Sequence, residues 1–289
     1  MVRGVWESQI LTLDDQVVMV ECGPMRMFID GSFEGTRQPD LCQRAGAAAI
    51  GFLEQIAKYR DSIMMPAAAL PEPPEGLLVR TMWAAASIIG DDDLTPMAAV
   101  AGTIADATAD FLAQSGLTRV IVNNGGDVAV RLTKGEKVSV GIRPDVNRPR
   151  ISHRMILVLE MGIGGACTSG LGGRSFTRGI ASAATVFADR AAIADAAATA
   201  IANATSVKAS SVHRGLAERI DPDTDLKGVE VVTSVGLLSD DEINMALGQG
   251  ITRAQQLIDR NVIKGACVAV KSKMRCTKNI SALIEPLAE

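Results

Sequence analysis

Residues 119–142 read RVIVNNGGDVAVRLTKGEKVSVGI, three short runs rich in valine and isoleucine with a glycine-containing turn between neighbouring runs. We expect one strand from each run, because β-branched residues favour strands and the segments Asn124-Gly125-Gly126 and Lys134-Gly135-Glu136 favour tight turns. Strands that follow one another without an intervening helix are typical of antiparallel pairing. The sequence therefore predicts the α+β class, with a two-layer α/β architecture and largely antiparallel sheets, rather than a doubly wound parallel sheet. The three expected strands are 119–123, 128–132 and 138–142.

The other elements are predicted from hydrophobic periodicity and from capping residues. Thr95 can cap a helix that begins at Pro96 and stops at Gly116, and Ser239 with Glu242 forms a capping box for the last helix. The other expected helices are 39–60 and 190–203, and the last runs over 239–260. Further strands are expected at 16–21, 26–30, 155–160, 181–187, 229–235 and 265–271.

The length suggests one large domain or two small ones. We expect one compact domain over residues 1–289, with the proline-rich stretch Pro66–Gly76 as a loop or a sub-domain seam. Hydrophobic residues make up 47% and charged residues 21%, enough for a sizeable core. The net charge of −4 and the aromatic content of 3% argue against a nucleic-acid binder. Many alanines permit close helix packing within or between subunits. We expect a homodimer, because homodimers are the commonest oligomers of soluble proteins.

The expected compartment is the cytoplasm. No apolar run reaches the roughly 18 residues that span a bilayer, and the first residues do not resemble a signal peptide. The five cysteines are odd in number and form no C-x-x-C pair, so we expect reduced thiols.

The turn in VNNGGD, residues 122–127, is the first candidate for a functional site. Two glycines let the backbone approach a ligand closely, and Asp127 behind them can orient a polar group. An ordinary hairpin turn is the alternative interpretation.

The second candidate is the segment MGIGGACTSGLGGRSFTRG, residues 161–179. Seven glycines and several hydroxyl groups suit an anion cradle, with Arg174 and Arg178 as partners for phosphate or carboxylate. The segment matches neither a P-loop nor a dinucleotide fingerprint, and a surface loop is the alternative.

The third candidate is Asp195-Ala-Ala-Ala-Thr199. Residues four apart share one face of a helix, so a carboxylate and a hydroxyl point the same way and offer oxygen donors to Mg²⁺. The alternative is that both residues only stabilise the helix. The acidic segment Asp221–Asp225 resembles an EF-hand loop but has Leu226 where that loop needs glycine.

In this order, the motifs resemble the ApbE family of flavin transferases, a fold related to the T-fold and compatible with a duplication. The resemblance is closest to the uncharacterised ApbE-like branch, the UPF0280 proteins. It covers residues 94–203 and is carried by four groups of residues. These are Ala101-Gly102 with Asp106, residues 122–127, Thr168-Ser169-Gly170, and residues 185–188 followed by Asp195–Thr199.

The resemblance implies a Mg²⁺-dependent reaction on FAD, in which a threonine of an acceptor protein attacks the FMN phosphorus and AMP leaves. Asp195 and Thr199 match the metal ligands of the family. We expect Asp127 and Ser169 to be catalytic. The residues expected to bind the substrate or cofactor are Asn124, Gly125, Gly126, Thr168, Gly170, Arg174, Ser175 and Arg178.

Two departures from the family pattern keep other functions open. Family members usually carry Lys-Gly where this chain has Ala101-Gly102, and a histidine-containing segment where it has 171–180. The alternatives are a different enzyme, for example a hydrolase, that handles a small anionic metabolite in the same cleft, and a non-catalytic flavin- or metabolite-binding protein.

Overall fold

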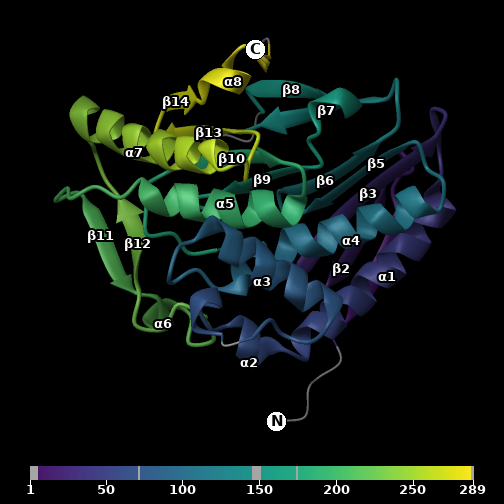
Figure 1. Cartoon of the computed structure of the whole chain (residues 1–289), viewed down its shortest axis with the longest axis horizontal. Coiled ribbons are helices and arrows are strands. Elements are labelled where there is room, and N and C mark those ends of the chain that lie inside the picture. The colour runs from purple at the N-terminus through teal and green to yellow at the C-terminus, as the bar shows by residue number, and fades with distance from the viewer. Residues whose placement is uncertain (1–5, 71, 145–150, 174, 288–289) are drawn as a thin grey trace.

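A computed structural model describes residues 6–70, 72–144, 151–173 and 175–287 (Figure 1). The strands are β1 (Ser8–Thr12), β2 (Val18–Cys22), β3 (Met25–Phe33), β4 (Thr36–Arg37), β5 (Arg119–Asn124), β6 (Asp127–Leu132), β7 (Lys137–Ile142), β8 (His153–Val158), β9 (Gly165–Ser169), β10 (Ala183–Ala188), β11 (Val212–Leu216), β12 (Glu230–Val235), β13 (Gly265–Val270), β14 (Lys273–Cys276) and β15 (Ile284–Pro286). The α-helices are α1 (Pro39–Ala57), α2 (Arg60–Ile63), α3 (Leu77–Ile89), α4 (Val100–Gln114), α5 (Ala191–Ala204), α6 (Ala217–Ile220), α7 (Asp240–Asp259) and α8 (Lys278–Ser281).

The main sheet contains ten of the described strands. Nine follow the order β1-β2-β3-β5-β6-β9-β10-β13-β14, and β4 pairs with β3. Every neighbouring pair in it is antiparallel. This confirms the predicted α+β class with largely antiparallel sheets.

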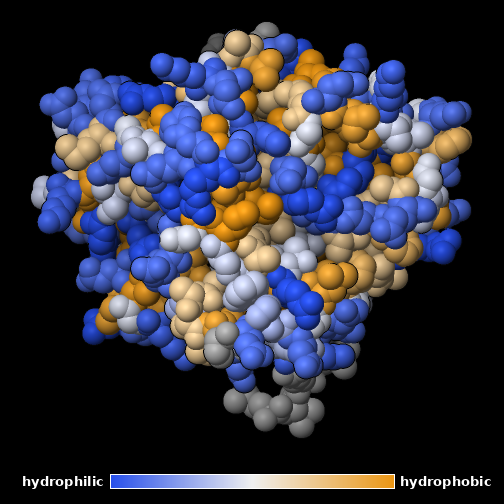
Figure 2. All heavy atoms as spheres, viewed as in Figure 1, coloured by the Kyte–Doolittle hydropathy of each residue, from blue (hydrophilic) through white to orange (hydrophobic). Residues whose placement is uncertain are grey.

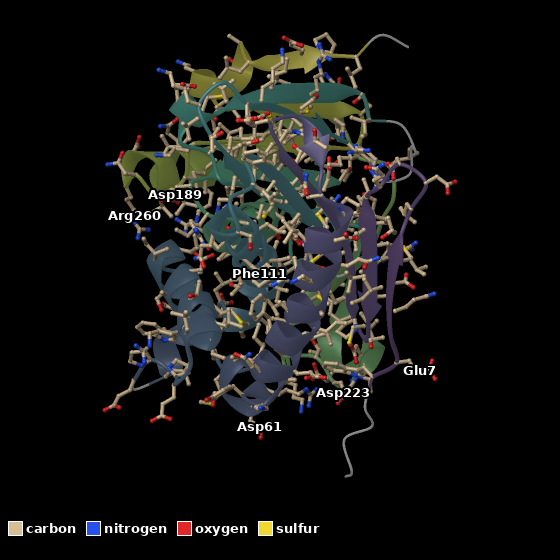
Figure 3. All side chains as sticks on the ribbon, turned by 90° about the vertical axis from the view of Figure 1, so that its right-hand side faces the viewer. Glu7, Asp61, Phe111, Asp189, Asp223 and Arg260 are labelled. Atoms are coloured by element: carbon tan, nitrogen blue, oxygen red, sulfur yellow. A yellow bond between two sulfur atoms is a disulfide. The ribbon has the colours of Figure 1, made fainter. Side chains whose placement is uncertain are left out.

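Helices cover one face of the main sheet. In the turned view of Figure 3, α3 and α7 lie on the left, α1 lies in the centre and the N-terminal strands lie on the right. Helix α5 packs against α3, α4 and α7 and lies on β9 and β10. Ten of its fourteen residues are buried, eight of them alanines, because a helix surrounded on all sides must be apolar all round. Small side chains let its neighbours approach closely, so α5 is held firmly at the centre of the helical layer.

A second, three-stranded sheet of order β15-β8-β7 covers part of the other face. Its inward residues, such as Val138, Met155 and Leu157, form a separate core with Val130 of β6 and Phe187 of β10. The middle of the main sheet is therefore buried on both faces, which explains why all six residues of β10 are buried.

The surface of the helical layer is mostly hydrophilic, with an apolar area near its centre over α3 and α5 (Figure 2). Among the described residues, the structure contains no helix with the length and apolar character needed to cross a membrane.

The structure differs from the sequence prediction in the helices near Thr95. The helix expected to begin at Pro96 opens with a 3-10 turn over Pro96–Ala99, and α4 begins at Val100. The Thr95 hydroxyl makes no capping hydrogen bond and donates instead to the carboxylate of Asp225, so the predicted cap is wrong. Helix α3 was not predicted, because it directly follows the proline-rich stretch.

The expectation that all cysteines are reduced is wrong for one pair. Cys267 of β13 and Cys276 of β14 form a disulfide, while Cys22, Cys42 and Cys167 are free and buried. The antiparallel register places Cys267 directly opposite Cys276, with 4.0 Å between their Cα atoms. Nothing in the spacing of the cysteines indicated this register.

Candidate active site

The three predicted motifs meet at one cavity of about 210 Å³, between the β5–β6 turn, the end of β9 and helices α4 and α5. Residues far apart in the sequence come together there because β5, β6 and β9 are neighbours in the sheet and α5 packs on β9. The predicted site residues that line the cavity are Asn124, Gly125, Asp127, Thr168, Ser169, Ser175, Asp195 and Thr199.

The β5–β6 turn is a two-residue hairpin that also forms a wall of the cavity. Asn124 and Asp127 pair across it, and Gly125 and Gly126 have φ angles of +70° and +113°, which other residues adopt only with strain. The Asn123 side-chain oxygen accepts a hydrogen bond from the Gly126 N–H at 2.9 Å. The Asn124 amide donates to the Ala101 carbonyl at 3.2 Å and so joins the turn to α4. The motif is therefore a hairpin turn, and it also lines the cavity.

Asp195 and Thr199 lie on the same face of α5, as their spacing predicts, and both line the cavity. The Asp195 residue is 9% exposed. Its Oδ2 accepts a hydrogen bond from the Gly102 N–H at 2.9 Å. Asp195 is thus fixed against the first turn of α4 rather than free in solvent.

Two carboxylates, those of Asp127 and Asp195, line the cavity. Burial raises the pKa of Asp195 well above its ordinary value, and the charge of Asp127 raises it further. Backbone N–H groups of Gly102 and Ala101 act in the opposite direction by stabilising the ionised form. A cation between the two carboxylates would remove their repulsion.

The donor set of the cavity consists of hard oxygen atoms, which fits a magnesium ion. It combines the carboxylates of Asp127 and Asp195 with the hydroxyl of Thr199. The described residues contain no group of three or more His, Cys, Asp and Glu side chains placed to hold a metal. A cation here would therefore depend on two carboxylates together with hydroxyl groups and oxygens of its substrate.

The end of β9 brings two hydroxyl groups to the cavity. Thr168 is exposed, and its Oγ1 lies 2.9 Å from the buried Thr185 Oγ1 on the neighbouring strand β10. Ser169 is half-buried beside it and also lines the cavity. The sequence interval that was expected to be one glycine-rich loop thus contains a strand, and this strand positions both hydroxyls.

The other predicted site residues that the structure describes, Gly126, Gly170 and Arg178, are not among the residues that line this cavity. Gly126 and Gly170 follow lining residues in the chain, but neither belongs to the described lining. Arg178 lies in an adjoining cavity, where its guanidinium forms an ion pair with Asp93. An anion bound to Arg178 would have to compete with that carboxylate. Arg174 lies outside the described residues.

The adjoining cavity, of about 370 Å³, shares six lining residues with the first, among them Ser175 and Thr199. Its far wall is the acidic segment that resembles an EF-hand loop, residues 221–226. Asp225 accepts the hydrogen bond from Thr95, and Asp223 pairs with Arg60 of α2 at 3.4 Å. This segment therefore forms a wall of the cleft.

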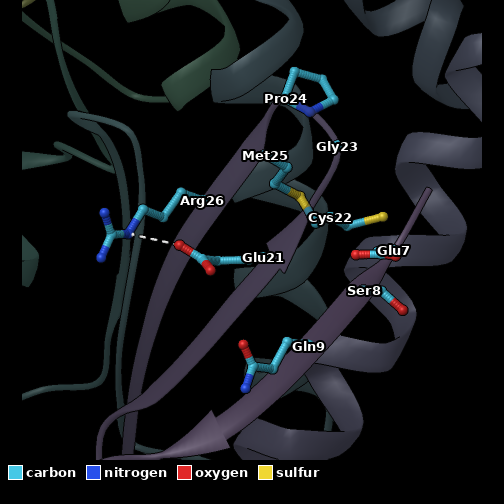
Figure 4. A pocket seen from close by; sticks show the side chains of 9 residues that line it. All are labelled: Glu7, Ser8, Gln9, Glu21, Cys22, Gly23, Pro24, Met25 and Arg26. Atoms are coloured by element: carbon cyan, nitrogen blue, oxygen red, sulfur yellow. Dashed lines mark ion pairs between the residues drawn. The ribbon is translucent and has the colours of Figure 1, made fainter.

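A larger hollow of about 1080 Å³ lies at the ends of β1, β2 and β3 (Figure 4). It is lined by residues 7–9 and 21–26, with an ion pair of 3.1 Å between Arg26 and Glu21. Pro24 and Met25 line both this hollow and the smaller cavity. The hollow contains none of the predicted site residues.

No sequence motif indicated an ion cluster that joins α4, β6 and the start of α5, in which Asp106 is buried and Asp110 and Arg190 are partly exposed. Asp106 and Asp110 of α4 bind Arg131 of β6 at 2.7 and 2.6 Å, and Arg190 at the start of α5 binds both aspartates. An arginine between Val130 and Leu132, and an aspartate on the apolar face of α4, were signals that could have indicated such a pairing.

Comparison with known proteins adds a family match. The model of a family described as AbpE bacteria matches residues 10–276. UPF0280 protein MK0206 of Methanopyrus kandleri is 44% identical over 143 residues, which are 49% of this chain and 54% of that protein. The UPF0280 protein of Methanococcoides burtonii is 33% identical over 164 residues, 56% of this chain and 64% of that protein. Each match spans less than two thirds of the relative.

Solved structures also resemble this chain at low sequence identity. The apo form of the flavinyl transferase ApbE from Pseudomonas stutzeri has a TM-score of 0.49 and 14% identity, and the match covers 96% of both chains. The flavin transferase ApbE from Vibrio cholerae has a TM-score of 0.37 and 12% identity, with 96% of this chain and 99% of that chain covered.

Proposed function

Because this chain belongs to the family described as AbpE bacteria, we propose that it is a Mg²⁺-dependent enzyme that acts on FAD or another pyrophosphate compound. The family match, together with the UPF0280 relatives, confirms the resemblance that the ordered motifs indicated. The observation that carries the proposal is the single cavity that brings together Asp127, Asp195 and Thr199 with the glycine turn of β5–β6.

The metal would be held by Asp195 and Thr199, and Asp127 lines the same cavity. These groups are oxygen donors, and the two carboxylates supply the negative charge that a divalent cation balances. When bound, Mg²⁺ would neutralise charge on the pyrophosphate and on its leaving group. Its fit rests on the donor set, since the carboxylates of Asp127 and Asp195 and the hydroxyl of Thr199 line one cavity.

The residues of the chain would position the nucleotide. The Gly125–Gly126 turn carries no Cβ, so its backbone can approach a phosphate or a ring closely. Thr168 and Ser169 would donate hydrogen bonds to phosphate oxygens, and the contact with Thr185 orients the Thr168 hydroxyl. Asp127 would orient the attacking hydroxyl group and accept its proton.

In the transfer that we propose, the oxygen of an acceptor hydroxyl forms a bond to the FMN phosphorus. The bond between that phosphorus and the AMP oxygen breaks, the acceptor's proton passes to the enzyme, and AMP leaves. The required partner is a protein with an accessible threonine or serine hydroxyl.

The test measures ligand binding and AMP release with the purified chain. A ligand at one hundred times its Kd stabilises a protein by about 2.7 kcal/mol, so FAD or ADP should raise the melting temperature, and more so with Mg²⁺. FAD incubated with Mg²⁺ and hydroxyl-bearing peptides should release AMP. Asp195→Asn should abolish both the Mg²⁺-dependent shift and the release of AMP.

Ser139→Ala on β7 provides a control, because this exposed residue lies outside the cavity and should leave both signals unchanged. If neither FAD nor ADP stabilised the wild-type chain with Mg²⁺ present, the proposed function would be wrong. FAD binding without AMP release from any acceptor would favour a non-catalytic flavin-binding protein instead.

A further inference from the structure

Helix α4 begins without a side-chain cap of its own, and Asp195 of α5 takes that place. The residue before α4 is Ala99, which has no hydrogen-bonding side chain, and the N–H groups of the first turn lack partners within the helix. Asp195 Oδ2 accepts a hydrogen bond there from the Gly102 N–H at 2.9 Å. The candidate metal ligand is therefore also the N-terminal cap of the neighbouring helix.

Helix α5 begins in the same way, and Asp106 of α4 caps it. Arg190 precedes α5 and provides no capping hydrogen bond, whereas Asp106 Oδ2 accepts from the Ala192 N–H at 3.0 Å. Asp106 is 1% exposed, so this contact is made in the interior. The two helices thus exchange caps through two buried aspartates.

The exchange couples the positions of the two helices, because their backbones are in direct contact between the two caps. A Cβ atom on Gly102 would lie 2.3 Å from the Ala191 carbonyl oxygen. On the other side of α5, a Cβ atom on Gly165 of β9 would lie 2.4 Å from the Ala191 Cα. The start of α5 is therefore in close contact with the backbone of both α4 and β9. Because these contacts are made by glycines, no side chain can move to relieve a displacement of α5.

Charge holds the Asp106 carboxylate in this position. Its Oδ1 accepts from Arg131 at 2.7 Å, and Arg190 approaches its Oδ2 at 3.3 Å. Asp110 binds the same two arginines from one turn further along α4 but makes no described contact with the backbone of α5. Asp110 therefore shares the charge environment of Asp106 without sharing its cap.

We propose that Asp106 is a positioning residue for Asp195, which fixes the candidate metal ligand by capping the helix that carries it. This inference rests on the proposed function only in treating Asp195 as a cation ligand. The position of Asp195 itself can be followed without a metal, through the hydrogen bond from the Gly102 N–H.

The experiment compares Asp106→Asn with its matched control, Asp110→Asn. Each removes one carboxylate charge from the same pair of arginines. Only the first alters the cap on Ala192, because Asp106 accepts from Arg131 with one oxygen and from the Ala192 N–H with the other, and an asparagine side chain has a single acceptor oxygen. Two quantities are measured on the folded full chain: amide hydrogen exchange of Gly102 by NMR, and the Kd of Mn²⁺ by electron paramagnetic resonance. Loss of an outer partner of a metal ligand lowers affinity about 10- to 100-fold.

We expect Asp106→Asn to speed exchange at Gly102 and to weaken Mn²⁺ binding about tenfold, and Asp110→Asn to leave both unchanged. Equal changes in the two variants, or no change at Gly102 in Asp106→Asn, would overturn the inference. If the wild-type chain did not bind Mn²⁺, the metal proposal would fail, while exchange at Gly102 would still decide the positioning role. If Asp106→Asn does not fold, the same two measurements are made on Arg131→Lys. A lysine cannot contact both aspartates through two separate nitrogen atoms as Arg131 does.

Discussion

Asp106 and Asp195 occupy corresponding places at the two ends of the α4–α5 contact, yet their surroundings carry opposite charge. Both are buried, and each accepts a hydrogen bond from the first turn of the other helix. Asp106 lies between Arg131 and Arg190, whereas Asp195 shares its cavity with a second carboxylate, Asp127.

We interpret this difference as the one between a structural charge and a charge of the proposed metal site. A buried carboxylate paired with two guanidinium groups is balanced within the chain. A buried carboxylate beside another carboxylate raises the energy of the folded protein, and such perturbed groups in a cavity are typical of functional sites. The two ends of the contact should therefore respond oppositely to the same substitution.

The largest effect is expected for Asp106→Ala, which leaves two arginines and the Ala192 N–H without their acceptor. Breaking a buried ion pair by removing one partner costs about 3–5 kcal/mol. Urea unfolding should show this loss of stability. The control is Asp110→Ala, whose carboxylate side chain is 32% exposed and should cost about 1 kcal/mol or less. Equal losses in the two variants would contradict a special role for Asp106.

Gly102→Ala should cause the next largest loss of stability. Its new methyl group would lie 2.3 Å from the Ala191 carbonyl oxygen and force α4 and α5 apart. Overpacking of this kind costs about 1–3 kcal/mol. Gly51→Ala in α1 is the matched control, since its methyl group would meet nothing within 4 Å. Replacing a helical glycine with alanine should stabilise the protein there by about 0.5–1 kcal/mol. The two substitutions should thus have opposite signs in thermal unfolding.

Asp195→Asn tests the functional end of the contact. The amide oxygen can still accept from the Gly102 N–H, while the repulsion from Asp127 disappears. Without Mg²⁺ the variant should be more stable than the wild type by about 1 kcal/mol, as is common when a functional charge is removed. Asp106→Asn should be less stable than the wild type. Urea unfolding at pH 8 in a chelator compares them, and a loss of stability in Asp195→Asn would refute the distinction.

The sequence predicted the parts of the site that depend on local structure. The Gly125–Gly126 hairpin followed from turn chemistry, and the shared face of Asp195 and Thr199 followed from helical periodicity. Their meeting at one cavity was implied only by the family resemblance, because it depends on β6 pairing with β9 and on α5 packing over β9. No local pattern specifies that pairing.

The reciprocal caps and the disulfide could not be predicted for the same reason. Asp106 caps a helix that begins 85 residues later, and Cys267 meets Cys276 through the register of β13 with β14. The Thr95 cap was mispredicted because a tertiary partner, Asp225, accepts the bond from its hydroxyl. In each case a long-range contact decides what a side chain does, and a single sequence carries no direct record of it.

The smallest expected effect is the change in the free energy of unfolding with pH. It is followed through Asp110, which binds the same arginines as Asp106, and through Asp195 at the other end of the contact. Burial raises the pKa of Asp110, but hydrogen bonds from Arg190 and Arg131 outweigh it, and the net pKa lies below its ordinary value. Because the pKa is depressed in the folded state, the contribution of Asp110 is present above about pH 4 and is lost as the pH falls below it.

The raised pKa of Asp195 has the opposite consequence, since the ionised form is disfavoured by folding. The wild type should lose stability relative to Asp195→Asn as the pH rises from about 4, because the unfolded chain releases this proton first. Relative to Asp110→Asn, the wild type should instead gain stability as the pH rises. The gain should be less than about 1 kcal/mol, since Asp110 is partly exposed. Urea unfolding of the three metal-free proteins from pH 3 to pH 8 measures both differences. If both stability differences changed with pH in the same direction, the charge environments of Asp110 and Asp195 would not be opposite, and the distinction would be wrong.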